Sequence, residues 1–376
     1  MISFKSASYW EKESFLSHVD YLIIGSGIVG LSTAIHLKLK APNKKVLVLE
    51  RGYLPSGAST KNAGFACIGS ASELLDDLNH NSSEVVVRTL HKRWKGLLYL
   101  RELLGDKPME FLKLGSNELF TAKEKLAFEN CTERLDWLNS ELKRITDLPN
   151  IYQINNRVIK ESNFSGFKYA ISNKAEGQLN TGKMMQLLIQ KAHSLGVIIL
   201  NNINVEKVDK KEVYTKLGKI FFKKLGICNN GFASQFLKDE DVRAVRAQII
   251  VTSPISNLSV NGIFHFDKGY YYFRNIGNRV LLGGGRNLAF KAEETDEQNT
   301  SDQIINHLSF LLETKVLPKK GFTIDHQWAG TMGVGEKKEP IVKKINETHY
   351  CAVRLGGMGV AIGSLVGKEL SELMLQ

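Results

Sequence analysis

A glycine-rich turn near the N-terminus, and an acid twenty residues beyond it, constrain the fold more than any other feature. An apolar run at 21–24 leads into the turn, whose glycines are Gly25, Gly27 and Gly30, and a second apolar run ends at Glu50. Gly25 permits a tight turn, Gly27 lets the backbone approach a pyrophosphate, and Gly30 lets the following helix pack against the strand. The spacing predicts a βαβ unit that binds a dinucleotide.

The two ends of this unit offer different groups to such a ligand. The helix that begins at the turn presents free N–H groups and a partial positive charge to the pyrophosphate. Glu50 stands where an acid accepts a hydrogen bond from a ribose hydroxyl. The motif alone leaves open whether the ligand is FAD or a nicotinamide dinucleotide, and a glycine-rich turn without a ligand is the alternative.

The length and composition are typical of a globular protein with about two domains. The chain has 376 residues, of which 43% are hydrophobic and 24% are charged. Its formal net charge is +11, but the lysines are scattered and interleaved with acids, which favours a solvated surface over a nucleic-acid interface. We therefore expect no nucleic-acid partner.

Signals for metal binding, secretion and membrane insertion are lacking in the sequence. The four cysteines lie far apart with no CxxC pair, which argues against a metal site and against a disulfide framework. Residues 1–19 lack the continuous apolar segment of a signal peptide. The apolar run at 21–24 is too short to span a bilayer. We expect a cytoplasmic protein without an integral membrane segment.

Strand and helix units of one kind recur at the beginning, middle and end of the chain. A helix at 182–195 leads into a strand at 197–200, and a strand at 350–355 leads through the glycine-rich turn 356–359 into a last helix. Helical segments and antiparallel strands lie between these units. We predict two interleaved domains: a nucleotide-binding domain at 1–75, 150–235 and 325–376, and a substrate domain at 76–149 and 236–324.

Further motifs extend the pattern over nearly the whole chain. They are Gly57-Ala-Ser-Thr-Lys-Asn-Ala-Gly64, Glu176-Gly-Gln-Leu-Asn180, Asn229-Asn-Gly231, Tyr270 to Gly285, Trp328-Ala-Gly330 and Arg354-Leu-Gly-Gly-Met-Gly359. With the N-terminal turn and Glu50, their order and spacing resemble the FAD-dependent oxidoreductases of the D-amino acid oxidase superfamily. This superfamily includes glycine oxidase, sarcosine oxidase and gamma-glutamylputrescine oxidase.

The resemblance implies an α/β protein with a Rossmann-type FAD-binding domain, interleaved with an α+β substrate domain built on an antiparallel sheet. It implies a reaction in which a hydride equivalent leaves the carbon next to the nitrogen of an amine or amino acid. The flavin accepts the hydride, the imine product hydrolyses, and oxygen or another electron acceptor reoxidises the flavin. The FAD is expected to be non-covalent, because no cysteine directly follows Trp328.

The resemblance also implies which residues hold the cofactor. Ser59 to Gly64 would run along the flavin, and Val205 would hold the adenine through its backbone. The C-terminal turn would place a helix N-terminus at the pyrimidine end of the flavin, where negative charge develops on reduction. The predicted FAD-binding residues are Gly25, Ser26, Gly27, Ile28, Gly30, Glu50, Arg51, Ser59, Thr60, Lys61, Asn62, Ala63, Gly64, Val205, Asn230, Gly231, Gly356, Gly357, Met358 and Gly359.

Three positions depart from the pattern of the resembled enzymes. Met358 stands where a histidine is common, and 280–282 lacks the lysine with which sarcosine oxidases activate oxygen. Thr331 follows Trp328-Ala-Gly330, where glycine oxidase has an arginine for the substrate carboxylate. Two alternatives to an oxidase therefore stay open: a dehydrogenase that passes electrons to a quinone or carrier, and a flavin-binding protein without catalysis.

Three residues are predicted to act in catalysis. Lys61 would lie beside the flavin and assist reoxidation, unless it faces solvent. Tyr271 points away from Tyr270 and Tyr272 on one strand, and would line the substrate pocket, unless it packs as an aromatic core residue. Arg354 directly precedes the C-terminal turn and would lie near the flavin or the substrate.

Other polar residues have a structural interpretation beside a functional one. Arg274 and Arg286 could bind a substrate carboxylate, but a surface ion pair is the alternative for each. His265 is interpreted as a structural histidine with satisfied hydrogen bonds, as is His326. No separate acid or base is required, since a dry aromatic pocket keeps the amine neutral.

Overall fold

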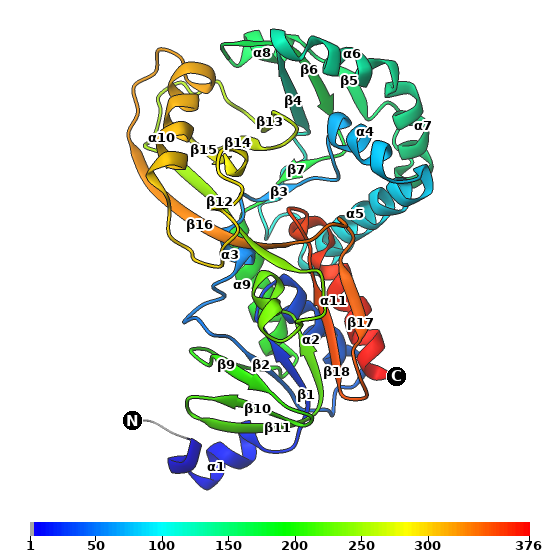
Figure 1. Cartoon of the computed structure of the whole chain (residues 1–376), viewed down its shortest axis with the longest axis vertical. Coiled ribbons are helices and arrows are strands. Elements are labelled where there is room, and N and C mark those ends of the chain that lie inside the picture. Colours follow the sequence, from blue (N-terminus) through cyan, green and yellow to red (C-terminus); the bar gives the residue numbers. More distant parts are fainter. Residues whose placement is uncertain (1–3) are drawn as a thin grey trace.

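The computed structural model describes residues 4–376, which form two lobes joined by several crossings of the chain (Figure 1). Each lobe is built around one eight-stranded sheet. The first described residues and the C-terminus lie in the lobe that contains β1. None of the helices in the described part of the chain has the length and hydropathy needed to cross a bilayer.

The first lobe contains the predicted βαβ unit, β1–α2–β2. Its sheet has the order β17-β18-β11-β1-β2-β8, in which β17 alone runs antiparallel to its neighbour. A second, antiparallel path continues from β11 through β10 to β9. The bounds are β1 Val19–Ile24, β2 Val46–Leu49, β8 Ile198–Leu200, β9 Val205–Val208, β10 Glu212–Thr215, β11 Gly218–Ile227, β17 Ile341–Lys344 and β18 His349–Val353.

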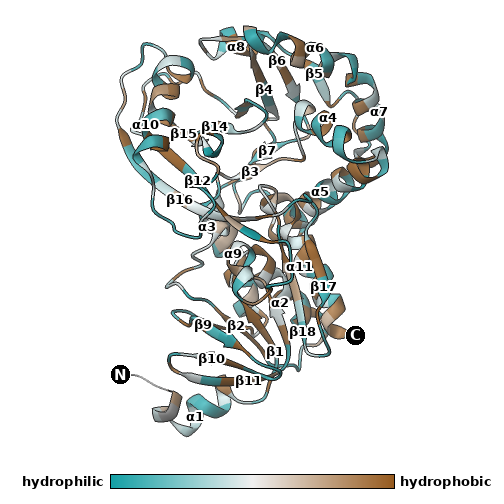
Figure 2. Cartoon of the chain, viewed as in Figure 1, coloured by the Kyte–Doolittle hydropathy of each residue, from teal (hydrophilic) through white to brown (hydrophobic). Residues whose placement is uncertain are grey.

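Helices cover one face of this sheet and the β9–β11 strands cover the other. Ile23 and Val48 point into a core shared with α2 (Ile28–Lys40), α9 (Thr181–Ser194) and α11 (Gly359–Leu375). Leu22 and Leu47 point into the opposite core. Because these strands are buried on both faces, they are apolar almost throughout, as their colour in Figure 2 shows.

The second lobe contains the mixed sheet β16-β12-β15-β14-β13-β4-β6-β5. All its pairings are antiparallel except the one between β13 and β4. The bounds are β4 Ser116–Thr121, β5 Tyr152–Ile154, β6 Phe167–Asn173, β12 Arg243–Thr252, β13 Ile263–Phe266, β14 Tyr271–Ile276, β15 Arg279–Gly284 and β16 Ile324–Val334. The expected antiparallel sheet of an α+β domain is thus present, with one parallel exception.

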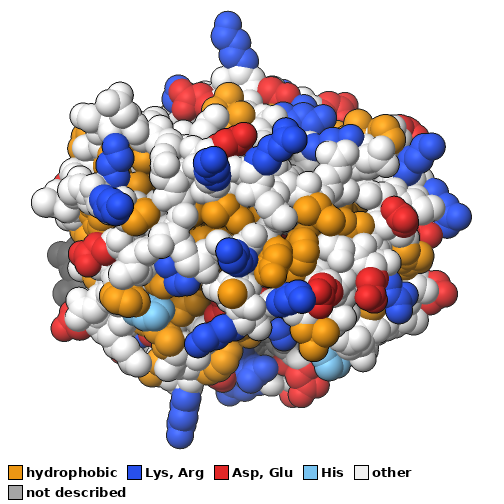
Figure 3. Space-filling model, turned by 90° about the horizontal axis from the view of Figure 1, so that it is seen from above, with side chains coloured by type: hydrophobic (Ala, Val, Ile, Leu, Met, Phe, Trp, Pro, Cys, Tyr) orange, Lys and Arg blue, Asp and Glu red, His pale blue; other side chains and the backbone are white. Residues whose placement is uncertain are grey.

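Helices and short segments complete the two lobes. The longer helices of the second lobe and the junction are α4 Ala71–His80, α5 Ser83–Leu104, α6 Lys125–Glu133, α7 Leu135–Thr146 and α10 Asp302–Leu311. The short elements are α1 Tyr9–Glu11, α3 Ala58–Lys61, α8 Arg157–Glu161, β3 Phe65–Ala66, β7 Gly177–Gln178 and the 3₁₀ turn η4 Asn230–Gln235. On the face in Figure 3, lysine and arginine side chains are dispersed among acids and apolar groups.

The strand pairings move two of the predicted domain boundaries. The segment 150–235 was expected in the nucleotide-binding domain, but β5 and β6 pair with each other and with β4 in the second sheet. The segment 325–376 likewise begins with β16, which pairs with β12 along its length. We propose boundaries near 175 and 335, because a strand belongs to the sheet that satisfies its backbone hydrogen bonds.

Glycines let the helices at the junction of the lobes approach closely. A Cβ atom at Gly96 of α5 would collide with the carbonyl oxygen of Ala361 in α11. A Cβ atom at Gly367 of α11 would lie 2.6 Å from the carbonyl oxygen of Val29 in α2. The three helices are therefore held at a backbone separation that side chains do not permit.

We expect Gly96→Ala to lower the free energy of unfolding by about 1–3 kcal/mol, because the added methyl group overpacks the contact between α5 and α11. Urea denaturation measures this change. Gly321→Ala is the matched control, since a Cβ atom there meets no other atom within 4 Å. Equal stability of the two variants would show that the helices separate without cost.

Candidate flavin and substrate site

A cavity of about 770 Å³ lies between the two lobes. Its walls include the β1–α2 turn, the loop through α3, the C-terminal turn before α11, and strands β12 to β14. Both glycine-rich turns thus open into one space, although they lie more than 300 residues apart in the sequence.

The first glycine turn forms a cradle at the N-terminus of α2. Gly25 has a φ of +100°, which glycine adopts without strain. A Cβ atom at Gly27 would lie 2.7 Å from Oγ of Ser59, so only glycine fits beneath this loop. The backbone N–H of Ile28 donates to the same Oγ at 2.9 Å. The turn, the helix N-terminus and the Ser59 hydroxyl therefore converge on one wall of the cavity.

Glu50 is buried and fixed by donors on both sides. One carboxylate oxygen accepts from the backbone N–H and hydroxyl of Ser26, at 3.1 and 2.8 Å. The other accepts from the N–H of Gly52 and the hydroxyl of Ser56. The carboxylate is thereby held against the cavity with its orientation set.

Apolar and aromatic side chains surround the cavity beyond Glu50. Ile203 and Val205 are buried beside it, and Phe236 lies across from them. The Arg51 guanidinium lies 3.6 Å from the centre of the Phe232 ring, a cation–π contact that fixes both groups. This pocket suits a flat, weakly polar ring system.

The C-terminal glycine-rich turn forms another part of the cavity wall. Gly356 has a φ of +56°, and a Cβ atom at Gly356, Gly357 or Gly359 would meet no protein atom within 4 Å. Asn230 ties the strand end before the turn, because its Oδ1 accepts from the backbone N–H groups of Arg354 and Leu355. The N-terminus of α11 therefore faces open space in the cavity.

These features fit FAD. Two helix N-termini and a glycine cradle suit its phosphates and its electron-rich ring, and Glu50 suits its ribose. The apolar pocket around Val205 suits the adenine. Most of these hydrogen-bond donors are backbone N–H groups. Such a set suits a ligand that is recognised mainly by its shape and its phosphate charge.

Residues 20–373 match the family of FAD-dependent oxidoreductases known as DAO. The chain belongs to this family. The gamma-glutamylputrescine oxidoreductase of Escherichia coli K12 is 22% identical over 94% of the chain and 83% of its own length. The fold is similar to L-proline dehydrogenase from P. horikoshii, with a TM-score of 0.74 at 17% identity over 96% and 94% of the two chains. It is also similar to glycine oxidase from Bacillus cereus, with a TM-score of 0.73 at 17% identity over 95% of each chain.

Most of the predicted FAD-binding residues line the cavity of this flavoprotein. Those in its wall are Gly25, Gly27, Ile28, Glu50, Arg51, Ser59, Lys61, Asn62, Ala63, Val205, Asn230, Gly356, Gly357, Met358 and Gly359. Those behind the wall are Ser26, Gly30, Thr60, Gly64 and Gly231. The second set acts indirectly: for example, a Cβ atom at Gly231 would lie 2.6 Å from the carbonyl oxygen of Met332.

Lys61, the last residue of α3, lines the cavity. Its Nζ donates to Oε1 of Gln298 at 2.7 Å, and its carbonyl oxygen accepts from the Trp328 indole at 2.9 Å. Burial lowers the pKa of the Lys61 ammonium, and the nearby Arg51 charge lowers it further. The side chain is therefore a partly desolvated cation at the cavity, not a lysine in bulk solvent.

The predicted pocket residue Tyr271 lies outside the cavity. Its side chain is buried in the opposite face of the sheet, stacked on Phe266, and its hydroxyl contacts His307 at 3.1 Å. Its neighbours Tyr270 and Tyr272 line the cavity instead. The side chains alternate along the strand as predicted, but Tyr271 lies on the face away from the cavity. Strand periodicity does not say which face of a strand lines a cavity.

Arg354 is also engaged elsewhere. Its guanidinium donates to the backbone and side chain of Asp241, at 3.0 Å each, and to the carbonyl oxygen of Glu339. With a φ of +64° it shapes the strand end before the C-terminal turn. Arg354 therefore lines the cavity with its guanidinium held by protein partners, and its catalytic role stays a prediction.

The two other candidate arginines, Arg274 and Arg286, differ in whether the side chain reaches the cavity. Arg274 is buried and donates to the carbonyl oxygens of Gly64 and Leu179, at 3.0 and 2.9 Å. Burial lowers its pKa to about 10. Arg286 lines the cavity, with its guanidinium 5.0 Å from the Phe290 ring centre. Of these two, only Arg286 is placed to meet a substrate carboxylate.

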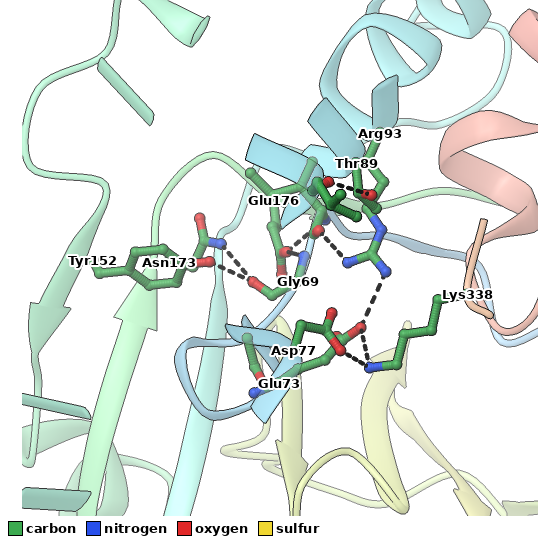
Figure 4. Close-up of polar contacts among 12 residues, drawn as sticks. Gly69, Glu73, Asp77, Thr89, Arg93, Tyr152, Asn173, Glu176 and Lys338 are labelled. Carbon is green, nitrogen blue, oxygen red and sulfur yellow. Dashed lines mark hydrogen bonds and ion pairs between the residues drawn. The ribbon is translucent and has the colours of Figure 1, made fainter. Parts of the chain in front are cut away.

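The far end of the cavity holds charged residues that the sequence analysis missed (Figure 4). Arg93 is buried and donates to the carbonyl oxygen of Ile68 at 2.8 Å and to Glu73 at 3.1 Å. Lys338 pairs with Asp77 and approaches Glu73 at 3.8 Å. These residues come from α4, α5 and the loop after β16, so no local sequence motif predicts that they lie together.

Glu176 closes this end from the segment before β7. It accepts from the backbone N–H groups of Ile68 and Gly69, at 2.6 and 2.9 Å, and from the Ser116 hydroxyl at 2.5 Å. Cys67 lines the cavity beside it. Burial and the Glu176 charge raise the pKa of the Cys67 thiol, so the thiol is neutral at physiological pH.

We expect Glu50→Ala to weaken FAD binding about 10–100-fold, because it removes a carboxylate that also orders Ser26 and Ser56. Titration of FAD into the flavin-depleted protein, followed by flavin fluorescence, measures the dissociation constant. Glu313→Ala, at an exposed position, is the control. An unchanged dissociation constant in Glu50→Ala would remove Glu50 from the cofactor site.

Proposed function

We propose that this flavoenzyme oxidises a C–N bond of an amine or amino acid to an imine. The proposal is carried by one observation: the FAD-compatible cavity continues past the flavin loop into a chamber with aromatic walls and a polar far end. Relatives support it by their names, since a gamma-glutamylputrescine oxidoreductase and a glycine oxidase act on compounds that contain nitrogen next to an oxidisable carbon.

The aromatic walls prepare the substrate nitrogen. Tyr272 lies against Phe65 with ring centres 5.4 Å apart, and burial raises the Tyr272 pKa to about 12, so its hydroxyl stays protonated. A dry surface of this kind disfavours an ammonium and favours the neutral amine, which releases hydride more readily. When FAD is bound, it accepts the hydride equivalent. The imine then hydrolyses in water.

The proposal includes two substrate classes, amino acids and simple amines. Arg286 is the cavity residue that would pair with the carboxylate of an amino acid. It lies at the rim rather than in the buried wall, and its side chain is partly exposed. A simple amine would need no such partner.

A dehydrogenase is the second candidate function. The strand position where sarcosine oxidases carry a lysine is apolar here, with Val280, Leu281 and Leu282 all buried. A similarly folded structure is an L-proline dehydrogenase. Rapid reoxidation by air would favour an oxidase, and slow reoxidation by air with rapid reoxidation by a quinone would favour this alternative.

Two further properties complete the proposal. Cys67 and Cys228 are the cysteines that line the cavity in the described part of the chain. We propose that FAD is held without a covalent bond, because the neutral thiol of Cys67 is a poor nucleophile. We also propose a cytoplasmic enzyme. The four cysteines are unpaired in the structure, as is usual in a reducing compartment.

An anaerobic screen tests the function. The FAD-loaded protein is mixed with a panel of amines and amino acids, and the flavin absorbance is followed. We expect bleaching by at least one compound that carries a C–H bond next to its nitrogen. A protein that binds FAD, but whose flavin no member of the panel reduces, would instead be a flavin-binding protein without this activity.

We expect Lys61→Met to slow flavin reoxidation about 10–100-fold, because it removes a preorganised positive charge from the cavity wall. Reduction by substrate should change far less. Stopped-flow absorbance measures the two half-reactions separately, and Lys61→Arg, which keeps the charge, is the control. Equal effects on both half-reactions would assign Lys61 to binding or structure.

A further inference from the structure

The cavity face of the second sheet carries a row of residues of which the chemistry above uses only Tyr272. Register places Glu118 of β4, His265 of β13, Tyr272 of β14 and Gly283 of β15 directly opposite one another. Directly opposite residues point to the same face. His265 and Tyr272 both line the cavity, so this row faces the substrate chamber.

His265 is not the satisfied histidine that the sequence suggests. Its Nε2 is buried, and among residues 4–376 it has no hydrogen-bond partner. A buried polar atom without a partner is rare in folded proteins, and in a ligand cavity it points to a missing ligand group. The neutral imidazole can accept one hydrogen bond and donate another.

The neighbours of His265 leave space above the ring. A Cβ atom at Gly283 would lie 2.5 Å from the Tyr272 ring, so the tyrosine leans over β15 and away from β13. On the other side, Glu118 is tied to Ser72 of α4 by the Ser72 backbone N–H at 3.1 Å and by its hydroxyl. Neither neighbour is therefore available to His265.

Glu73 faces the same chamber from α4. Both of its cationic partners, Arg93 and Lys338, contact Oε1, and its side chain keeps 22% of its surface exposed (Figure 4). Burial raises the Glu73 pKa, but the charges of Arg93 and Lys338 lower it by more, so the carboxylate is ionised. Its Oε2 remains able to accept a hydrogen bond.

We propose that His265 and Glu73 form a second recognition site, distal to the flavin, for a hydrogen-bond donor at the far end of the substrate. This inference rests on the proposed amine oxidation. It narrows the substrate class to amines that carry a second N–H or O–H group, such as an ammonium, an amide or a hydroxyl. A distal carboxylate is disfavoured, since it would meet the Glu73 charge.

The test compares amines that differ only at the far end. The probes are 1,4-diaminobutane, 4-aminobutanamide, 4-aminobutan-1-ol and n-pentylamine, used with the FAD-loaded enzyme. We expect the wild type to show a lower KM for at least one of the donor-bearing probes than for n-pentylamine. His265→Leu should raise that KM about tenfold, or about 1.4 kcal/mol, while leaving kcat within about twofold.

Three variants separate recognition from structure. His265→Gln keeps a donor and an acceptor, and should retain part of the preference. Glu73→Gln should weaken the diamine most, because it removes the charge that attracts a second ammonium. His326→Leu, at an exposed position of β16, is the matched control and should change no KM value. Thermal unfolding of each variant checks that it is folded.

Several outcomes would overturn the second site. One is an equal rise in KM for n-pentylamine and the donor-bearing probes in His265→Leu, and another is no rise for any probe. If the wild type oxidises no amine, the proposed function fails separately. Calorimetric binding of the same four probes to the FAD-loaded protein then tests the site, and equal affinity for all four would reject it.

Discussion

The close approach of helix backbones at the junction of the lobes is the constraint on which the rest of the structure depends. Gly30 lets α2 start directly against β1, and Gly367 lets α11 pack against the first turn of α2. These two helices begin at the two glycine-rich turns. Their packing therefore sets both N-termini beside one cavity, with their partial positive charges directed at the same ligand.

The two faces of the second sheet have different surroundings. One face packs the aromatic core of Phe264, Phe266 and Phe273, and the other supplies Tyr272 and His265 to the cavity. A pleated strand makes this division automatic, because successive side chains point in opposite directions. Most charged groups around the cavity are tied to protein partners, so those with spare hydrogen-bonding capacity, His265 and Glu73, stand out.

The sequence predicted much of the fold, because the glycine turns and their strands are local patterns. Most of the residues that it predicted for the cofactor site line the cavity. It was less successful with the substrate domain. We propose other boundaries than those near 150 and 325, because β5, β6 and β16 pair into the second sheet. These are short or ordinary strands whose sheet is decided by distant partners. Tyr271 lies on the other face of its strand from the cavity, where Phe266 and His307 of other segments contact it. Arg354 lines the cavity, and Asp241 holds its guanidinium.

By itself, the sequence determined the βαβ unit, the position of Glu50 and the existence of a second glycine turn, because each depends on residues within one short segment. Only the tertiary structure decided which face of β14 lines the cavity. It alone brought Glu73, Arg93, Lys338 and His265 to the wall of one cavity. Side-chain neighbours from four separate elements depend on strand register and helix packing, and no local pattern of residues encodes those.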